Sequence, residues 1–122
     1  MELSPVLHFL KDCQCGKTHT LDIRAVEIEE GLVEKAGAVL AANGFPRRIL
    51  VVSDESAMSA CEGLMRSLDR AGFCCKTKLY KDMRTARLET AQEIGRLSSD
   101  ADGILSVGTG SVNDLCRYAA GQ

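Results

Sequence analysis

Apolar positions along this chain follow two patterns, short continuous runs and helical spacing. Residues 49–52 form a continuous apolar run and residues 104–107 a short, mostly apolar one, and both are typical of parallel strands that are buried on both faces. Two less regular stretches also have strand character, and the first of them shows the partial alternation of an edge strand. We therefore expect strands over residues 20–28, 49–53, 74–80 and 104–107, with the runs 49–52 and 104–107 at the buried centre of the sheet.

Between these strands, apolar residues recur with the spacing of helices. Asn43-Gly44 and Gly72 provide stop signals, and one unbroken helix is expected between Asp54 and Gly72. The regular alternation of strands and helices predicts one domain over residues 1–122. Its expected architecture is α/β: a Rossmann-like, doubly wound, mostly parallel sheet with helices on both faces.

Charge and composition narrow the class of protein. The net charge of −2 gives no positive surface for nucleic acid or an anionic membrane. No apolar run approaches the length of a membrane span, and the N-terminus lacks the pattern of a secretion signal. We therefore expect a cytoplasmic protein without nucleic-acid or membrane partners, whose six cysteines stay reduced.

Three potential metal ligands, Cys13, Cys15 and His19, lie close together near the N-terminus. A structural zinc ion needs four ligands, and only three are close here. The alternative is a tight turn, with Gly16 at its corner, that leads into the first strand. We favour the turn and expect no metal ion at this cluster.

A glycine-rich segment, Gly108-Thr109-Gly110-Ser111, joins the last predicted strand to a helix that is expected to start at Val112. A helix N-terminus presents unpaired N–H groups and a positive dipole end, which favour a phosphate. The same segment is also typical of an ordinary strand-to-helix turn in which Ser111 caps the helix. The loop alone does not separate the two interpretations.

Asp54 follows the buried run 49–52 directly. Ligands of doubly wound sheets bind at the carboxyl ends of the strands, where a carboxylate can accept hydrogen bonds from a ribose. A simple helix N-cap is the commoner role of an Asp at such a junction, and from the residues alone we favour that role.

The order of these features is the reverse of the usual dinucleotide fingerprint, in which the glycines precede the acid. An acid followed by a later glycine loop resembles the superfamily of iron-containing alcohol dehydrogenases, glycerol dehydrogenases and dehydroquinate synthases. Within it, the chain is most similar to sn-glycerol-1-phosphate dehydrogenases, including their AraM-like bacterial branch. The likeness is carried by residues 13–19, by 51–54 and, most specifically, by 107–120, which read VGTGSVNDLCRYAA.

The resemblance implies NAD or NADP as the cofactor. NAD is favoured because a carboxylate at Asp54 would repel a 2′-phosphate. Asp54 is assigned by this likeness to the adenosine ribose. The pyrophosphate is assigned to the loop and helix start, Gly108, Thr109, Gly110, Ser111 and Val112.

The resemblance also implies a reaction. In full-length members, NAD(P)H reduces dihydroxyacetone phosphate to sn-glycerol 1-phosphate, and a zinc or nickel ion polarises the carbonyl. An Asp and two His from later in those chains hold the metal, and no residue here matches them. We therefore expect an N-terminal cofactor-binding domain with no catalytic or metal-binding residues, inactive by itself; a homo-oligomer is left open.

Two other interpretations stay open. One is a related glycerol dehydrogenase or a dehydroquinate synthase-like enzyme; the residues Asn113-Asp114 and Arg117-Tyr118 argue against the second of these. The other is a stand-alone nucleotide-binding module without catalytic activity.

Overall fold

The computed structural model describes residues 3–18 and 22–122, in two units that divide after Leu32. In the first unit, helix α1 (Ser4–Lys11) carries a proline in its first turn, where no backbone donor is lost. The strand predicted over residues 20–28 is wrong for its described part, because residues 22–28 have no regular secondary structure. Alternation produces a strand only where a neighbour accepts its hydrogen bonds, and Ile23 and Ile28 instead stay exposed.

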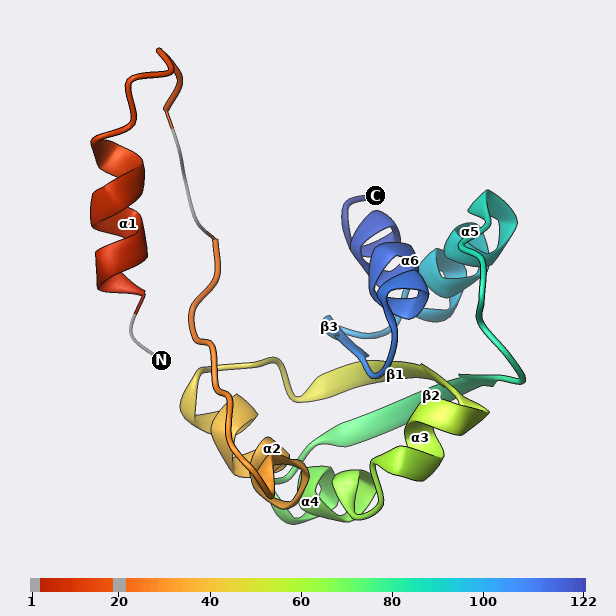
Figure 1. Cartoon of the computed structure of the whole chain (residues 1–122). Helices are drawn as coiled ribbons and strands as arrows, with labels where there is room; N and C mark the ends of the chain where they lie inside the picture. Colours follow the sequence, from red (N-terminus) through yellow and green to blue (C-terminus); the bar gives the residue numbers. More distant parts are fainter. Residues whose placement is uncertain (1–2, 19–21) are drawn as a thin grey trace. The chain divides into compact units, whose positions relative to one another are not determined.

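The second unit is built on a three-stranded sheet (Figure 1). Its strands are β1 (Arg48–Asp54), β2 (Cys74–Tyr80) and β3 (Gly103–Ser106), in the order β2-β1-β3. Both neighbours run parallel to β1, and Val51 lies opposite Thr77 on one side and Leu105 on the other. The predicted α/β class, with a parallel sheet and flanking helices, is confirmed.

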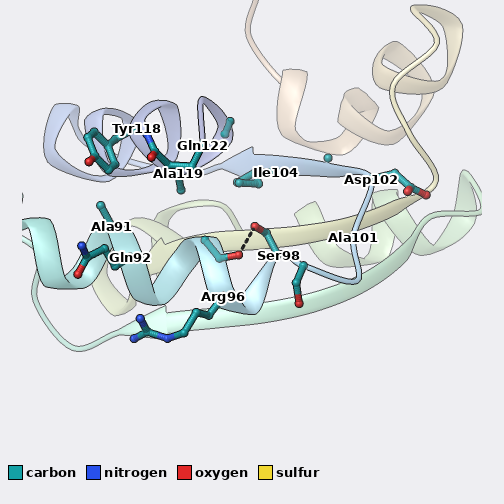
Figure 2. A pocket seen from close by; sticks show the side chains of 14 residues that line it. Ala91, Gln92, Arg96, Ser98, Ala101, Asp102, Ile104, Tyr118, Ala119 and Gln122 are labelled. Atoms are coloured by element: carbon teal, nitrogen blue, oxygen red, sulfur yellow. Dashed lines mark hydrogen bonds between the residues drawn. The ribbon is translucent and has the colours of Figure 1, made fainter.

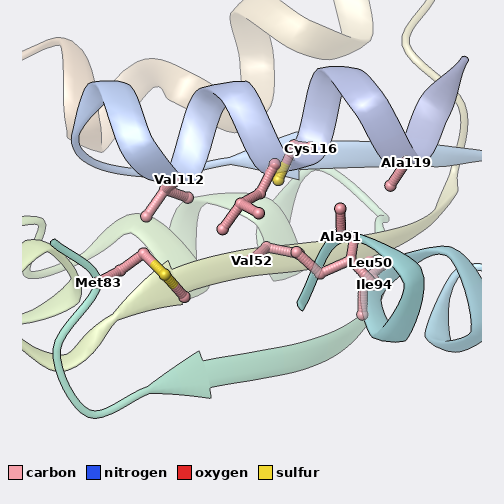
Figure 3. Packing of buried hydrophobic residues seen from close by; sticks show 9 residues of the cluster. Leu50, Val52, Met83, Ala91, Ile94, Val112, Cys116 and Ala119 are labelled. Carbon is pink, nitrogen blue, oxygen red and sulfur yellow. The ribbon is translucent and has the colours of Figure 1, made fainter. Parts of the chain in front are cut away.

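Strand β1 separates two apolar cores, one on each face of the sheet. Leu50 and Val52 pack with α5 (Leu88–Leu97) and α6 (Gly110–Ala120), as Figure 3 shows. Ile49 and Val51 point to the other face, against α2 (Leu32–Ala42) and α4 (Leu64–Arg70). All four side chains are at most 1% exposed. The apolar run of β1 therefore reflects burial on both faces of the sheet, as expected for a central parallel strand.

The expectation that 104–107 would also be central is wrong. Strand β3 lies at an edge, and its residues are only half-buried, although Val107 just beyond it is buried. A short apolar run indicates that both faces of a strand are covered, but it does not indicate whether that strand has one neighbouring strand or two. No strand in the described part of the chain lies on the outer side of β3.

The helix expected between Asp54 and Gly72 is divided into α3 (Glu55–Ala60) and α4. The break falls at Gly63, whose φ of +93° lies in the left-handed region that a helix cannot include. The apolar spacing continues across the break, because Met58, Cys61 and Leu64 all pack in the same core.

Helices α2 and α4 approach each other closely at Gly37. The N–H of Gly37 donates to Ser67 Oγ at 2.9 Å, and the same hydroxyl donates to the carbonyl of Glu34 at 3.0 Å. Ser67 is buried, so its hydroxyl satisfies both groups away from water. The contact leaves no room for a side chain at position 37.

A hydrogen bond from Tyr80 to Glu93 joins the end of β2 to α5. Tyr80 Oη donates to Glu93 Oε1 at 2.7 Å. Burial, together with this bond to a carboxylate, raises the pKa of the Tyr80 hydroxyl above its usual value. The same bond lowers the pKa of Glu93.

We expect Tyr80→Phe to lower the free energy of unfolding by about 1 kcal/mol at neutral pH, because one hydrogen bond is lost. A hydroxyl whose pKa is raised on folding stabilises the folded protein at pH values below its pKa in the unfolded chain, about 10. This contribution to the free energy of unfolding is lost as the pH rises from that value through the pKa of the folded state. The stability difference between wild type and Tyr80→Phe should therefore shrink above pH 10. Urea unfolding between pH 7 and 11 measures it, with the exposed Tyr118→Phe as control. A difference that stays constant across this range would contradict the role of the Tyr80 hydroxyl.

Candidate functional site

The carboxyl ends of β1 and β3 lie at the same end of the sheet, and the chain leaves the two strands there in different directions. Strand β1 continues into α3 on one face, whereas β3 continues into α6 on the other (Figure 1). Such a point, where neighbouring connections leave on opposite faces, is where open α/β sheets bind ligands. A pocket of about 650 Å³ lies here, lined by Asp54, Ser56, Ala57, Ala60, Asp82, Met83, Arg84, Thr109, Gly110 and Ser111.

Asp54 is the N-cap residue of α3, as the residues alone favoured. Its Oδ1 accepts a hydrogen bond from the N–H of Ala57 at 2.7 Å, and the residue is 4% exposed. Within the described residues this is the single hydrogen bond of the carboxylate. The cap fixes the orientation of Asp54 at the pocket wall, so capping and ligand binding are compatible roles.

Gly108 and Gly110 have different reasons to be glycine. Gly108 has a φ of +133°, and a Cβ there would lie 2.8 Å from the Cβ of Ala57, so the turn itself requires glycine. A Cβ on Gly110 would meet no protein atom within 4 Å. The space beside Gly110 is therefore open, at the first residue of α6.

Helix α6 directs its N-terminal backbone into this pocket. The helix begins at Gly110, two residues before the expected start, and its N-cap Thr109 makes no side-chain capping bond. Asn113 N–H already bonds to the carbonyl of Thr109 at 3.0 Å, whereas the N–H groups before it have no acceptor within the helix. No acidic side chain lies in the first turn. The positive end of the helix dipole is thus available to an anion.

The structure limits how two of the predicted site residues, Ser111 and Val112, can contact a ligand. Ser111 is not the N-cap; it lies inside α6, and its hydroxyl donates to the carbonyl of Arg84 at 3.1 Å. The side chain of Val112 is fully buried in the core, so only its backbone can reach a ligand.

The connection from β2 to α5 supplies pocket residues that the sequence did not reveal. Residues 81–84 have the composition of a polar linker, and in the structure Asp82, Met83 and Arg84 line the pocket beside Ser111. Met83 is 8% exposed and packs in the core, which anchors the connection. The available signal was the position of these residues directly after the carboxyl end of a parallel strand.

The described residues offer no metal site. No group of three or more His, Cys, Asp or Glu side chains among them is placed to hold an ion. Cys13 and Cys15 are exposed, and His19 lies outside the described residues, so the expectation for this cluster stays a prediction. Burial raises the pKa of the thiols of Cys75 and Cys116, which disfavours the reactive thiolate.

A second, larger hollow of about 850 Å³ lies at the other end of the sheet (Figure 2). It is bounded by Asp102 and Ile104, at the start of β3, and by the C-terminal ends of α5 and α6, including Ser98 and Ala119. Helix C-termini are the negative ends of their dipoles and so disfavour a phosphate. We therefore place the candidate site at the smaller pocket.

Comparison with known proteins is consistent with the parallel α/β fold. The sequence profile of a family described as iron-containing alcohol dehydrogenase matches residues 27–122. A comparison with curated proteins gives no significant match. None of the helices in the described ranges has the length and apolar character needed to cross a membrane.

Among solved structures, the chain is similar to NADH-dependent butanol dehydrogenase A from Thermotoga maritima, with a TM-score of 0.67 and 18% sequence identity. The likeness covers 84% of this chain and 27% of that one, so the chain spans about a quarter of that protein's length. Together, the fold and the profile match define a parallel α/β domain of a dehydrogenase family. The chain belongs to the iron-containing alcohol dehydrogenase family.

Proposed function

We propose that this chain is the cofactor-binding part of an NAD(P)-dependent sn-glycerol-1-phosphate dehydrogenase. One observation carries the proposal: Asp54 and the N-terminus of α6 line the same pocket, at the carboxyl ends of two parallel strands. A carboxylate and an array of N–H groups side by side suit a ligand with both a hydroxyl donor and a phosphate. The adenosine diphosphate half of a dinucleotide has both.

In this proposal, the N–H groups of Gly110, Ser111 and Val112 bind the pyrophosphate. The open space at Gly110 lets the phosphate approach the backbone, and the helix dipole favours its negative charge. Gly108 positions the loop, because its left-handed φ sets the turn from β3 into α6. The bound cofactor supplies or accepts the hydride; this chain holds and orients it.

Asp54 accepts hydrogen bonds from the adenosine ribose in this proposal. Its bond from Ala57 occupies one oxygen and holds the carboxylate in place before the ligand arrives. A negative charge here repels a 2′-phosphate, so NAD is favoured over NADP.

The substrate class follows from the resemblance of residues 107–120 to sn-glycerol-1-phosphate dehydrogenases. The proposed reaction of the whole enzyme is the reduction of dihydroxyacetone phosphate to sn-glycerol 1-phosphate. A zinc or nickel ion belongs to that proposal, but the described residues do not fit one. Within the described part of the chain, the contribution that we assign is cofactor binding.

The nucleotide assignment is tested by calorimetric titration with AMP and adenosine 2′,5′-bisphosphate, which differ only in the 2′-phosphate. Wild type should bind AMP more tightly. Asp54→Asn should reduce the ratio of the affinity for AMP to the affinity for the bisphosphate several-fold, because Asn keeps the capping oxygen but removes the charge. The stability of Asp54→Asn should stay within about 0.5 kcal/mol of wild type, because Asn and Asp cap helices about equally well.

Two results would contradict the proposal in different ways. If neither nucleotide binds wild type, the pocket is not a nucleotide site. If both bind and Asp54→Asn leaves their ratio unchanged, the ribose assignment of Asp54 fails and its role is that of a helix cap alone.

A further inference from the structure

The connection between β2 and α5 is held against the glycine loop at Arg84. Met83 anchors it in the core, and Ser111 Oγ donates to the backbone carbonyl of Arg84 at 3.1 Å. The backbone of Arg84 is thereby fixed next to the first turn of α6. Its side chain is 86% exposed, so the guanidinium can reorient about this fixed point.

Arg84 is the one cationic side chain among the residues that line the pocket, which also include the acids Asp54 and Asp82. Its Nε lies 2.8 Å from Oδ2 of Asp82. Both partners are solvent-exposed, and exposed ion pairs of this kind contribute little free energy. A ligand phosphate can accept two parallel hydrogen bonds from the guanidinium and carries more charge than one carboxylate, so it can replace Asp82.

We propose that Arg84 binds a phosphate of the nucleotide in this pocket and that Asp82 competes with that phosphate for the guanidinium. The inference rests on the proposed function only for the nature of the ligand, a nucleoside diphosphate group. It adds a side chain to the backbone site of α6. In the same proposal Asp82 weakens phosphate binding, because the Asp82 carboxylate occupies the guanidinium of Arg84 and repels the incoming phosphate.

The test is calorimetric titration of the full chain with ADP and, in parallel, with adenosine. Arg84→Ala should weaken ADP binding at least fivefold, and Asp82→Asn should strengthen it several-fold. Neither variant should change adenosine binding. In the double variant, the gain from Asp82→Asn should shrink, because the guanidinium that it releases is no longer present.

Arg87→Ala is the matched control. It removes the same charge from the same connection, but Arg87 is exposed and does not line this pocket. It should leave ADP binding within twofold of wild type. Circular dichroism verifies that each variant is folded.

The outcomes separate this inference from the proposed function. If wild type binds neither ADP nor adenosine, both fail. If wild type binds ADP and Arg84→Ala resembles Arg87→Ala, the assignment of Arg84 is wrong while the nucleotide site stands. If Asp82→Asn weakens ADP binding, the competing role of Asp82 is wrong.

Discussion

Replacing Gly37 with alanine is expected to lower the free energy of unfolding by about 3 kcal/mol, the upper end of the usual cost of overpacking. A Cβ at this position would lie 2.2 Å from the carbonyl oxygen of Ser67 and 2.9 Å from the Cβ of Ala71. A backbone oxygen cannot move aside as a flexible side chain can, so α2 and α4 would have to separate. The hydrogen bond from Gly37 to Ser67 Oγ would then be lost, and the shared core would loosen.

Gly95→Ala is the matched control for this substitution. Gly95 also lies inside a helix, α5, but a Cβ there would meet no atom within 4 Å. Alanine should therefore raise stability by about 0.5–1 kcal/mol through its better helix propensity. Urea unfolding of both variants measures the contrast. Equal effects of the two substitutions would show that α2 and α4 do not pack closely at Gly37.

Gly110→Val is expected to abolish nucleotide binding without unfolding the protein. The valine side chain would occupy the open space in front of the first turn of α6, where the phosphate is proposed to lie. It would meet no protein atom at its Cβ, so the fold should tolerate it. The affinity for ADP should fall at least tenfold, about 1.4 kcal/mol, as measured by calorimetric titration.

Two further variants make this result specific. Gly110→Ala, with a smaller side chain, should weaken ADP binding less than valine does. Gly95→Ala, at the opposite end of the sheet, should leave it unchanged. If Gly110→Val binds ADP as well as wild type, the phosphate does not lie at the start of α6, and the glycine loop is an ordinary strand-to-helix turn.

The position of the candidate site could be predicted from the sequence, whereas the contacts within it could not. Asp54 and the glycine loop both follow apolar runs, and parallel strands bring their carboxyl ends to one edge. Asp54 and the glycine loop are two walls of the pocket. The third wall contains Arg84, which is brought there by the fold of the connection after β2 and by the bond from Ser111. No local pattern indicates that bond, because the two residues are 27 positions apart.

Local sequence patterns were sufficient to predict some of the elements. The strand character of residues 74–80 predicted the bounds of β2, and the continuous apolar run 49–52 predicted the burial of β1; both signals depend only on near neighbours along the chain. Which segments pair could be learned only from the tertiary structure. It placed β3 at an edge, left residues 22–28 without a partner strand, and brought Gly37 against Ser67. Pairing and close packing depend on residues far apart in the chain, so no short stretch of sequence contains that information.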